Sequence, residues 1–286
     1  MNHEISFAKY HGCGNDFILK DEMTGRRTPD KVRSRIATVL CDRHFSVGAD
    51  GVIFIEKAWG SDGSMRLFEP AGNEADMCGN GLRCVAAFLM KRLDKTEVRV
   101  LTRDGVKLVK RVGSRYRVDM GPVRTECQYL SEYVSDAKTG SADLMKVLIS
   151  VDERVLRCSI VNTGEPHIVV RSKDLGSEDV RKIGALVNSD RKRFPKGVNI
   201  NFVETVGPNE VKVRTYERGV YDETLACGTG ATASAAVALQ QGWVKNRRVN
   251  VAAVGGCLTI ELAKDGRAYM TGPAEMVFEG RASVEA

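Results

Sequence analysis

The chain has 286 residues, of which 43% are hydrophobic and 28% are charged, and its net charge is +6. This length allows one large or two ordinary domains with substantial cores, and the balanced composition excludes a low-complexity chain. The most apolar helical run, residues 231–239, has nine residues, whereas a membrane span needs about 20. We therefore expect a globular protein with no membrane partner.

The charged residues and the cysteines indicate which kinds of partner and which cellular compartment to expect. The basic clusters at 26–35 and 191–196 are short, interrupted by prolines and acids, and poor in aromatics. This pattern favours a solvated surface over a nucleic-acid interface. The first ten residues lack the apolar core of a secretory signal, so we expect a cytoplasmic protein. The eight cysteines contain no Cys-x-x-Cys, which argues against structural zinc and for reduced thiols.

Strand-like and helix-like segments alternate along the chain, which predicts an α/β protein. In the first half, apolar and β-branched runs bounded by turn residues predict strands, and an apolar face ending in Lys91 and Arg92 predicts a helix over 81–94. The predicted strands are 52–56, 65–69, 97–102 and 116–120 in the first half, and 159–171, 198–204, 211–217 and 257–262 in the second. The matching second helix is predicted over 230–242.

Three landmarks occur twice in the same order. The first landmark is a glycine turn that enters an apolar strand, at 11–19 and at 162–170. The second is a Cys-Gly-X-Gly sequence in front of a predicted helix, starting at Cys78 and at Cys227. The third is a Gly-Pro pair that ends the segments 118–122 and 269–273. Repeats at a nearly constant offset predict an internal duplication into two similar domains, with a boundary in the polar stretch after Pro122. A site between such halves would receive one cysteine from each.

The Cys-Gly-X-Gly elements suit chemistry at a helix N-terminus. If each helix begins just after its cysteine, exposed amides there can bind a substrate carboxylate, and the helix dipole favours the thiolate. Lowering a thiol pKa from about 8.5 to about 6.5 needs roughly 2.7 kcal/mol, whereas a helix terminus supplies about 0.3–1 and at most about 2 kcal/mol. A further donor or base is therefore needed, and His167 and Glu217 are the candidates.

Two other interpretations of these elements were weighed. The second element also fits Gly-x-Gly-x-x-Ala, a dinucleotide-binding pattern, but it follows a polar turn-like segment and no acid stands about 20 residues on. Alternatively, each cysteine only caps a buried helix and has no chemical role. This interpretation is the better one for a single cysteine, but not for two cysteines in matching sequence contexts. Two cysteines facing one substrate instead predict a two-base inversion, in which a thiolate removes a carbon-bound proton and the opposite thiol delivers one. Neither a cofactor nor a metal is expected.

Six ordered motifs give the chain a resemblance to the diaminopimelate epimerase family over nearly its whole length. They are KYHGCGNDFIL, CDRHFSVGADGVIF, EADMCGNGLRC, VNTGEPHIVV, FPKGVNINFVE and RTYERGVYDETLACGTGA. The resemblance implies a cofactor-independent isomerase interconverting LL- and meso-diaminopimelate on the lysine and cell-wall route, often as a homodimer. It also implies two pseudo-symmetric domains, at 1–125 (completed by about the last ten residues) and 126–275. Each would be a curved mixed sheet around a central helix, with the active site in the cleft between them.

The resemblance also implies roles for single residues. Cys78 and Cys227 resemble the acid–base pair, and His167 and Glu217 resemble residues that assist the thiols. The expected substrate contacts are Asn15, Glu69, Gly79, Asn80, Glu165, Asn199, Glu217, Arg218, Gly228 and Thr229. Among them, the planar fork of Arg218 suits the distal carboxylate of the substrate.

Two positions depart from the family pattern, because Glu69 and Glu165 stand where many members have substrate-contacting asparagines. A glutamate cannot donate to a carboxylate unless it is protonated. One alternative is therefore a racemase of a cationic amino acid such as lysine, ornithine, arginine or histidine. Another is that the two side chains turn aside or pair with Arg218, so that diaminopimelate still binds. From other classes, a binding protein without catalysis and a nucleic-acid binder remain as weaker hypotheses.

Overall fold

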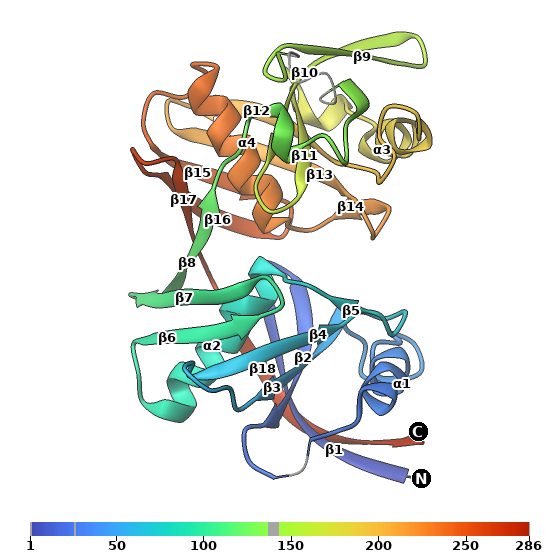
Figure 1. Cartoon of the computed structure of the whole chain (residues 1–286), viewed down its shortest axis with the longest axis vertical. Coiled ribbons are helices and arrows are strands. Elements are labelled where there is room, and N and C mark those ends of the chain that lie inside the picture. Colours follow the sequence, from blue (N-terminus) through green and yellow to red (C-terminus); the bar gives the residue numbers. More distant parts are fainter. Residues whose placement is uncertain (1, 26, 137–142, 286) are drawn as a thin grey trace. The chain divides into compact units, whose positions relative to one another are not determined.

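The computed structural model describes residues 2–25, 27–136 and 143–285, and its chain divides into two compact units (Figure 1). Unit 1 consists of Met1–Asp119 and Thr271–Ala286, and unit 2 is the continuous stretch Met120–Met270. Strands β8 (Arg115–Pro122) and β17 (Arg267–Gly272) run across the two boundaries between the units.

Unit 1 is one mixed sheet with two helices. Hydrogen bonding places its strands in the order β18–β1–β2–β3–β4–β6–β7–β8, with the short β5 added to β4. The first and last strands of the chain lie side by side, as the blue and red ends of Figure 1 show. The remaining elements are β1 (Asn2–Gly12), β2 (Asn15–Glu22), α1 (Asp30–Leu40), β3 (Gly51–Glu56), β4 (Gly63–Phe68), β5 (Glu74–Ala75), α2 (Gly79–Leu93), β6 (Glu97–Thr102), β7 (Gly105–Val112) and β18 (Glu275–Glu285).

Unit 2 repeats this plan. Its strands pair in the order β9–β10–β11–β12–β13–β15–β16, and the short β14 pairs with β13. The elements are β9 (Val147–Val151), β10 (Arg154–Asn162), β11 (Pro166–Arg171), α3 (Val180–Ser189), β12 (Asn199–Gly207), β13 (Glu210–Glu217), β14 (Asp222–Thr224), α4 (Gly228–Gln240), β15 (Arg248–Ala253) and β16 (Gly256–Leu262), with short 3-10 turns at Cys127–Tyr129 and Leu175–Ser177.

The pairing senses show the duplication directly. From β1 to β7 the successive pairs are antiparallel, parallel, antiparallel, parallel and antiparallel. The series from β10 to β16 is the same, with α1 and α3, and then α2 and α4, in matching places. The predicted fold class, two duplicated α/β halves, is confirmed.

Each sheet wraps around one central helix. Helix α2 contacts β1, β2, β3, β4, β6 and β18, and α4 contacts β10, β11, β12, β13, β15 and β16. Both helices are apolar on most sides, which is typical of a helix enclosed by other elements. Small residues dominate α4 (GTGATASAAVALQ), so strands approach its backbone closely, and nine of its residues are buried. The sheets thus enclose the two segments that follow Cys78 and Cys227.

Two sequence expectations are corrected by the structure. The stretch 159–171 is two strands and not one, because Gly164 adopts φ +96° and its amide donates to the side chain of Asn162, which closes a turn between β10 and β11. The basic cluster at 26–35 is not simply solvated, because it begins helix α1 and its Arg33 is fully buried. Glu22 and Glu56 both accept hydrogen bonds from that guanidinium and make its burial possible.

Candidate functional site

The two cysteines occupy equivalent places, each at the N-cap of a central helix. Cys78 precedes α2 and Cys227 precedes α4, both with extended backbone (φ −137° and −110°). Their carbonyls accept the first helical hydrogen bonds, from Leu82 and Ala231, each at 2.8 Å. Each helix thus begins directly after its cysteine, two residues before the starts predicted at 81 and 230. Such N-caps lie beside the unsatisfied amides and the positive end of the helix dipole, which favour a thiolate or a bound carboxylate.

In unit 1, three of the predicted site residues contact one another, namely Cys78, Asn15 and Asn80. The Cys78 thiol donates to Oδ1 of Asn15 at 3.6 Å, and Nδ2 of Asn80 donates to the same oxygen at 3.2 Å. Asn15 reaches this position because its own Nδ2 donates to Asp50 at 2.6 Å. Asp50 therefore decides which end of the Asn15 amide faces the thiol. It lies in the VGADG segment but was not predicted as a site residue.

Arg83, in the first turns of α2, holds the side chain of Asn80 in place by a hydrogen bond. Its Nη2 donates to Oδ1 of Asn80 at 2.8 Å, and its Nε donates to the carbonyl of Pro273 at 3.0 Å. The side chain is fully buried, and burial is the largest cause that lowers the pKa of its guanidinium. Burial also raises the pKa of Cys84 to about 12, so Cys84 stays a thiol. Arg83 was not predicted as a site residue.

Glu69 is not joined to this group by any contact that the structure gives for the described residues. It stands in the turn after β4, where its amide donates to the carbonyl of Asn73 at 2.9 Å and its carboxylate accepts from the Asn73 side chain. The turn is completed by Gly72, whose φ of +86° favours glycine. The Glu69 side chain thus stabilises the turn in which it lies.

In unit 2, Cys227 is the more enclosed of the two cysteines, with 7% of its surface exposed. The amide of Gly230 donates to its sulfur at 3.3 Å, and the Thr229 hydroxyl lies 3.3 Å from the same atom. Gly230 is required here, because a Cβ at this position would come within 2.4 Å of Asn201 Oδ1. Gly228 and Thr229 thus form the first turn of α4 around the sulfur, as Gly79 and Asn80 form that of α2.

His167 is the second residue of β11 and is fully buried. Burial lowers the pKa of its imidazole to about 3, and the positive charge of Arg218 acts in the same direction. The ring is therefore neutral at physiological pH. Its Nδ1 lies 3.1 Å from Nδ2 of Asn201, a buried residue of the neighbouring strand β12.

Three of the remaining predicted residues of unit 2, namely Asn199, Arg218 and Glu165, form one hydrogen-bonded group. Asn199 accepts from the backbone amide of Arg218 at 2.8 Å and donates to the carbonyl of Pro166 at 3.0 Å. Arg218 Nε donates to Glu165 Oε2 at 3.0 Å, and its Nη2 donates to the same oxygen. Glu217 accepts from the Thr224 hydroxyl at 2.9 Å. The alternative in which Glu165 pairs with Arg218 is thus the one observed.

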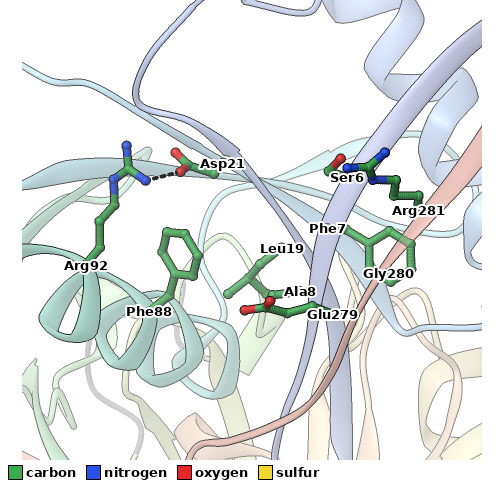
Figure 2. Close-up of a pocket in the computed structure, with 10 residues that line it drawn as sticks. All are labelled: Ser6, Phe7, Ala8, Leu19, Asp21, Phe88, Arg92, Glu279, Gly280 and Arg281. Atoms are coloured by element: carbon green, nitrogen blue, oxygen red, sulfur yellow. Dashed lines mark hydrogen bonds and ion pairs between the residues drawn. The ribbon is translucent and has the colours of Figure 1, made fainter.

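A surface pocket of about 500 Å³ in unit 1 contains none of the predicted site residues. It lies over β1, β2, β18 and one face of α2, and Figure 2 shows Phe88 beside the ion pair of Arg92 with Asp21.

Within the described ranges, no helix is long and apolar enough to cross a membrane. Within the same residues, no three or more His, Cys, Asp or Glu side chains gather as metal ligands would.

Comparison with known proteins adds an independent line of observation. The family model described as diaminopimelate epimerase matches residues 7–126 and 159–277. A diaminopimelate epimerase of Methanothrix thermoacetophila is 41% identical over 288 residues, covering 99% of this chain and 98% of the relative. That of Methanocella arvoryzae is 38% identical, covering 99% and 98%.

Solved structures share the fold at lower identity. A PhzF-family phenazine biosynthesis protein of Bacillus anthracis has a TM-score of 0.70 at 17% identity, covering 98% of this chain and 99% of its own. A hydroxyproline epimerase of Agrobacterium vitis has a TM-score of 0.69 at 15% identity, covering 98% and 92%. These likenesses support the fold alone. The family match and the near-full-length relatives go further: the chain belongs to the diaminopimelate epimerase family.

Proposed function

We propose that this chain interconverts LL- and meso-2,6-diaminopimelate, with Cys78 and Cys227 as its two acid–base groups. The observation that supports this most is the duplicated placement of a cysteine at the N-cap of each central helix. A binding protein needs the amides of these helix starts but not a thiol at each. The two units would be the two epimerase halves, each contributing one of the two cysteines.

In the proposed reaction, the carboxylate next to the reacting carbon binds the exposed amides at the helix starts, including those of Gly79–Asn80 and Gly228–Thr229. One thiolate takes the α-proton, and the electron pair left on carbon is delocalised into that carboxylate, where the amides stabilise the added charge. The opposite thiol then gives its proton to the other face of the carbon. The configuration of the α-carbon is inverted, the thiolate has become a thiol, and the opposite thiol has become a thiolate. Nothing is oxidised or reduced. Neither a cofactor nor a metal is required.

The contacts at each sulfur suit one of these two forms. The Gly230 amide donates to the sulfur of Cys227, which stabilises negative charge there. The Cys78 sulfur instead donates to Asn15 Oδ1, which holds a proton on it. Each turnover needs both forms. Added to the helix dipoles, such hydrogen bonds are a further source of the roughly 2.7 kcal/mol that a two-unit fall in thiol pKa requires.

At the distal end of the substrate, Arg218 is the group we propose for the second carboxylate. Glu165 already occupies part of the Arg218 fork, so it is balanced by this positive charge and need not recognise a cationic side chain. The racemase of a cationic amino acid is therefore not favoured, and relatives at about 40% identity bear the name diaminopimelate epimerase.

The test is proton NMR of LL-diaminopimelate in D₂O with the reduced protein. We expect loss of the α-proton signal, and a loss of rate of about 10²–10⁴-fold in Cys78→Ser and in Cys227→Ser. The control is Cys158→Ser, because burial raises the pKa of this β10 cysteine to about 12. Exchange in lysine, arginine or histidine instead would favour the cationic racemase, and silence with every amino acid would favour a binding protein.

We also propose a homodimer, located in the cytoplasm on the lysine and cell-wall route. The support for the dimer is the outer strand β18, where Met276, Val277 and Phe278 are 44%, 56% and 43% exposed. They directly precede Glu279, Gly280 and Arg281, which line the pocket. Three adjacent exposed apolar side chains favour a protein interface. Light scattering should give twice the 31.4 kDa chain mass, and Phe278→Glu should lower it. A monomeric mass for the wild type would refute the dimer.

A further inference from the structure

The orientation of the Asn201 amide in β12 is fixed by its hydrogen bond to a backbone carbonyl. Its Nδ2 donates to the carbonyl of Ile168 at 3.0 Å, and its Oδ1 accepts from the Thr215 hydroxyl at 3.0 Å. An exchanged amide would place its oxygen against the carbonyl oxygen of Ile168, which can only accept, whereas the Thr215 hydroxyl can pair with either end of the amide. The end of Asn201 that faces His167 is therefore its NH₂ group, and Asn201 is fully buried.

This donor decides where the imidazole proton lies. Nδ1 of His167 is 3.1 Å from Nδ2 of Asn201, so Nδ1 must supply the lone pair and the single proton of the neutral ring lies on Nε2. A second proton is disfavoured, because the ring is fully buried and lies near the charge of Arg218. Nε2 is buried and has no hydrogen-bond partner among the residues that the structure describes.

Asn201 also lies against the catalytic turn of this half. The first turn of α4 approaches so closely that a Cβ on Gly230 would come 2.4 Å from Asn201 Oδ1 and 3.3 Å from the Cys227 sulfur. One amide thus contacts His167 on one side and the turn holding Cys227 on the other. A change in its hydrogen bonding is expected to affect both.

We propose that Asn201 is a positioning residue that holds His167 as the neutral Nε2–H tautomer, so that His167 serves the reaction as a hydrogen-bond donor and not as a base. This inference rests on the proposed epimerase function. The acceptor is an anion of the reaction, either a thiolate sulfur or a substrate carboxylate. His167 would stabilise that anion without exchanging a proton with it, in the manner of an oxyanion-hole donor.

The experiment reads the tautomer directly, by long-range ¹H–¹⁵N correlation of the four histidines in the whole protein. His167 is assigned by its loss in His167→Gln. We expect a protonated Nε2 and an unprotonated Nδ1 in the wild type. In Asn201→Asp, a carboxylate accepts from Nδ1–H, the proton moves to Nδ1, and α-proton exchange should fall by about 10²–10³-fold. Thr215→Val removes only the hydroxyl that donates to Oδ1 and leaves the Ile168 carbonyl to orient the amide, so it should keep the Nε2–H tautomer with a smaller loss of exchange.

The matched control is Asn188→Asp, another buried asparagine of unit 2, whose amide bonds the carbonyls of Gly184 and Val198. It should lose stability but keep the His167 tautomer and the exchange rate per folded molecule. The pH dependence of cysteine alkylation separates the acceptors: a raised midpoint in Asn201→Asp indicates a thiolate, whereas an unchanged midpoint with a raised KM indicates the carboxylate.

Two results would overturn the inference: an Nδ1–H tautomer in the wild type, or an Asn201→Asp protein with the Nδ1–H tautomer and undiminished exchange. The wild-type spectrum needs no variant to fold. Absence of diaminopimelate exchange in the wild type would count against the proposed function alone, because the tautomer is measured independently.

Discussion

The pair of Glu165 and Arg218 leads to a quantitative prediction about substrate affinity. Two hydrogen bonds join the guanidinium to one carboxylate oxygen, and the two side chains are 43% and 24% exposed. A distal substrate carboxylate must share or displace Glu165. An ion pair this exposed contributes about 0.2–1 kcal/mol. Glu165→Gln keeps the side-chain length and removes the charge, so KM for diaminopimelate should fall by about 1.4- to 5-fold with little change in kcat.

The assay is α-proton exchange at varied diaminopimelate concentration, at low and high salt. Salt screens the wild-type pair, so the difference in KM between wild type and Glu165→Gln should shrink as salt rises. The control is Glu4→Gln, which removes the partner of Arg281 from a similar exposed pair in unit 1. A raised KM in Glu165→Gln would refute the reasoning, because it would make Glu165 a recognition group. An unchanged KM would mean that the substrate does not use the Arg218 fork.

Three further predictions concern stability. Arg33→Met leaves two buried glutamates without their guanidinium, and urea unfolding should show a loss of about 3–5 kcal/mol; a loss under about 1 kcal/mol would contradict this. Gly184→Ala places a Cβ 2.1 Å from the Tyr216 ring, so it should lower stability by about 1–3 kcal/mol despite better helix propensity, and an unchanged urea midpoint would refute the clash. Burial would raise the pKa of Asp16, but hydrogen bonds from Arg43 and a buried lysine outweigh it and lower that pKa to about 2. Asp16 should therefore stabilise the fold above about pH 4 and lose this effect as pH falls toward 2, and acid unfolding of Asp16→Asn that is as steep as the wild type would contradict it.

The sequence was sufficient for features with a local cause. The Cys-Gly-X-Gly starts of α2 and α4 follow from glycine before an apolar run, and the duplication follows from repeated landmarks. Helix α3 was missed although Asp179 is a recognisable N-cap that accepts from the Lys182 amide at 3.0 Å. Here the signal was present and not used.

Other features depend on partners that are distant in sequence. The burial of Arg33 requires glutamates from two strands, and only the folded sheet brings those strands together. The orientation of Asn15 depends on Asp50, which lies 35 residues on. Asn201 resembled any polar residue in an apolar strand, and its role became visible only once His167 was placed beside it. Such contacts have no periodicity that a single sequence could display.

The pairing of β1 with β18 has a consequence for synthesis of the chain on the ribosome. Unit 2 is continuous, so its strands β9 to β16 and its central helix have been made once residue 270 is added. Unit 1 must wait, because its strand β1 pairs with residues as late as Glu285. Until β18 emerges, β1 has an open edge, the kind of edge that recruits other chains. Translation thus reverses the usual order in which the N-terminal part folds first: the half that is begun first is completed last.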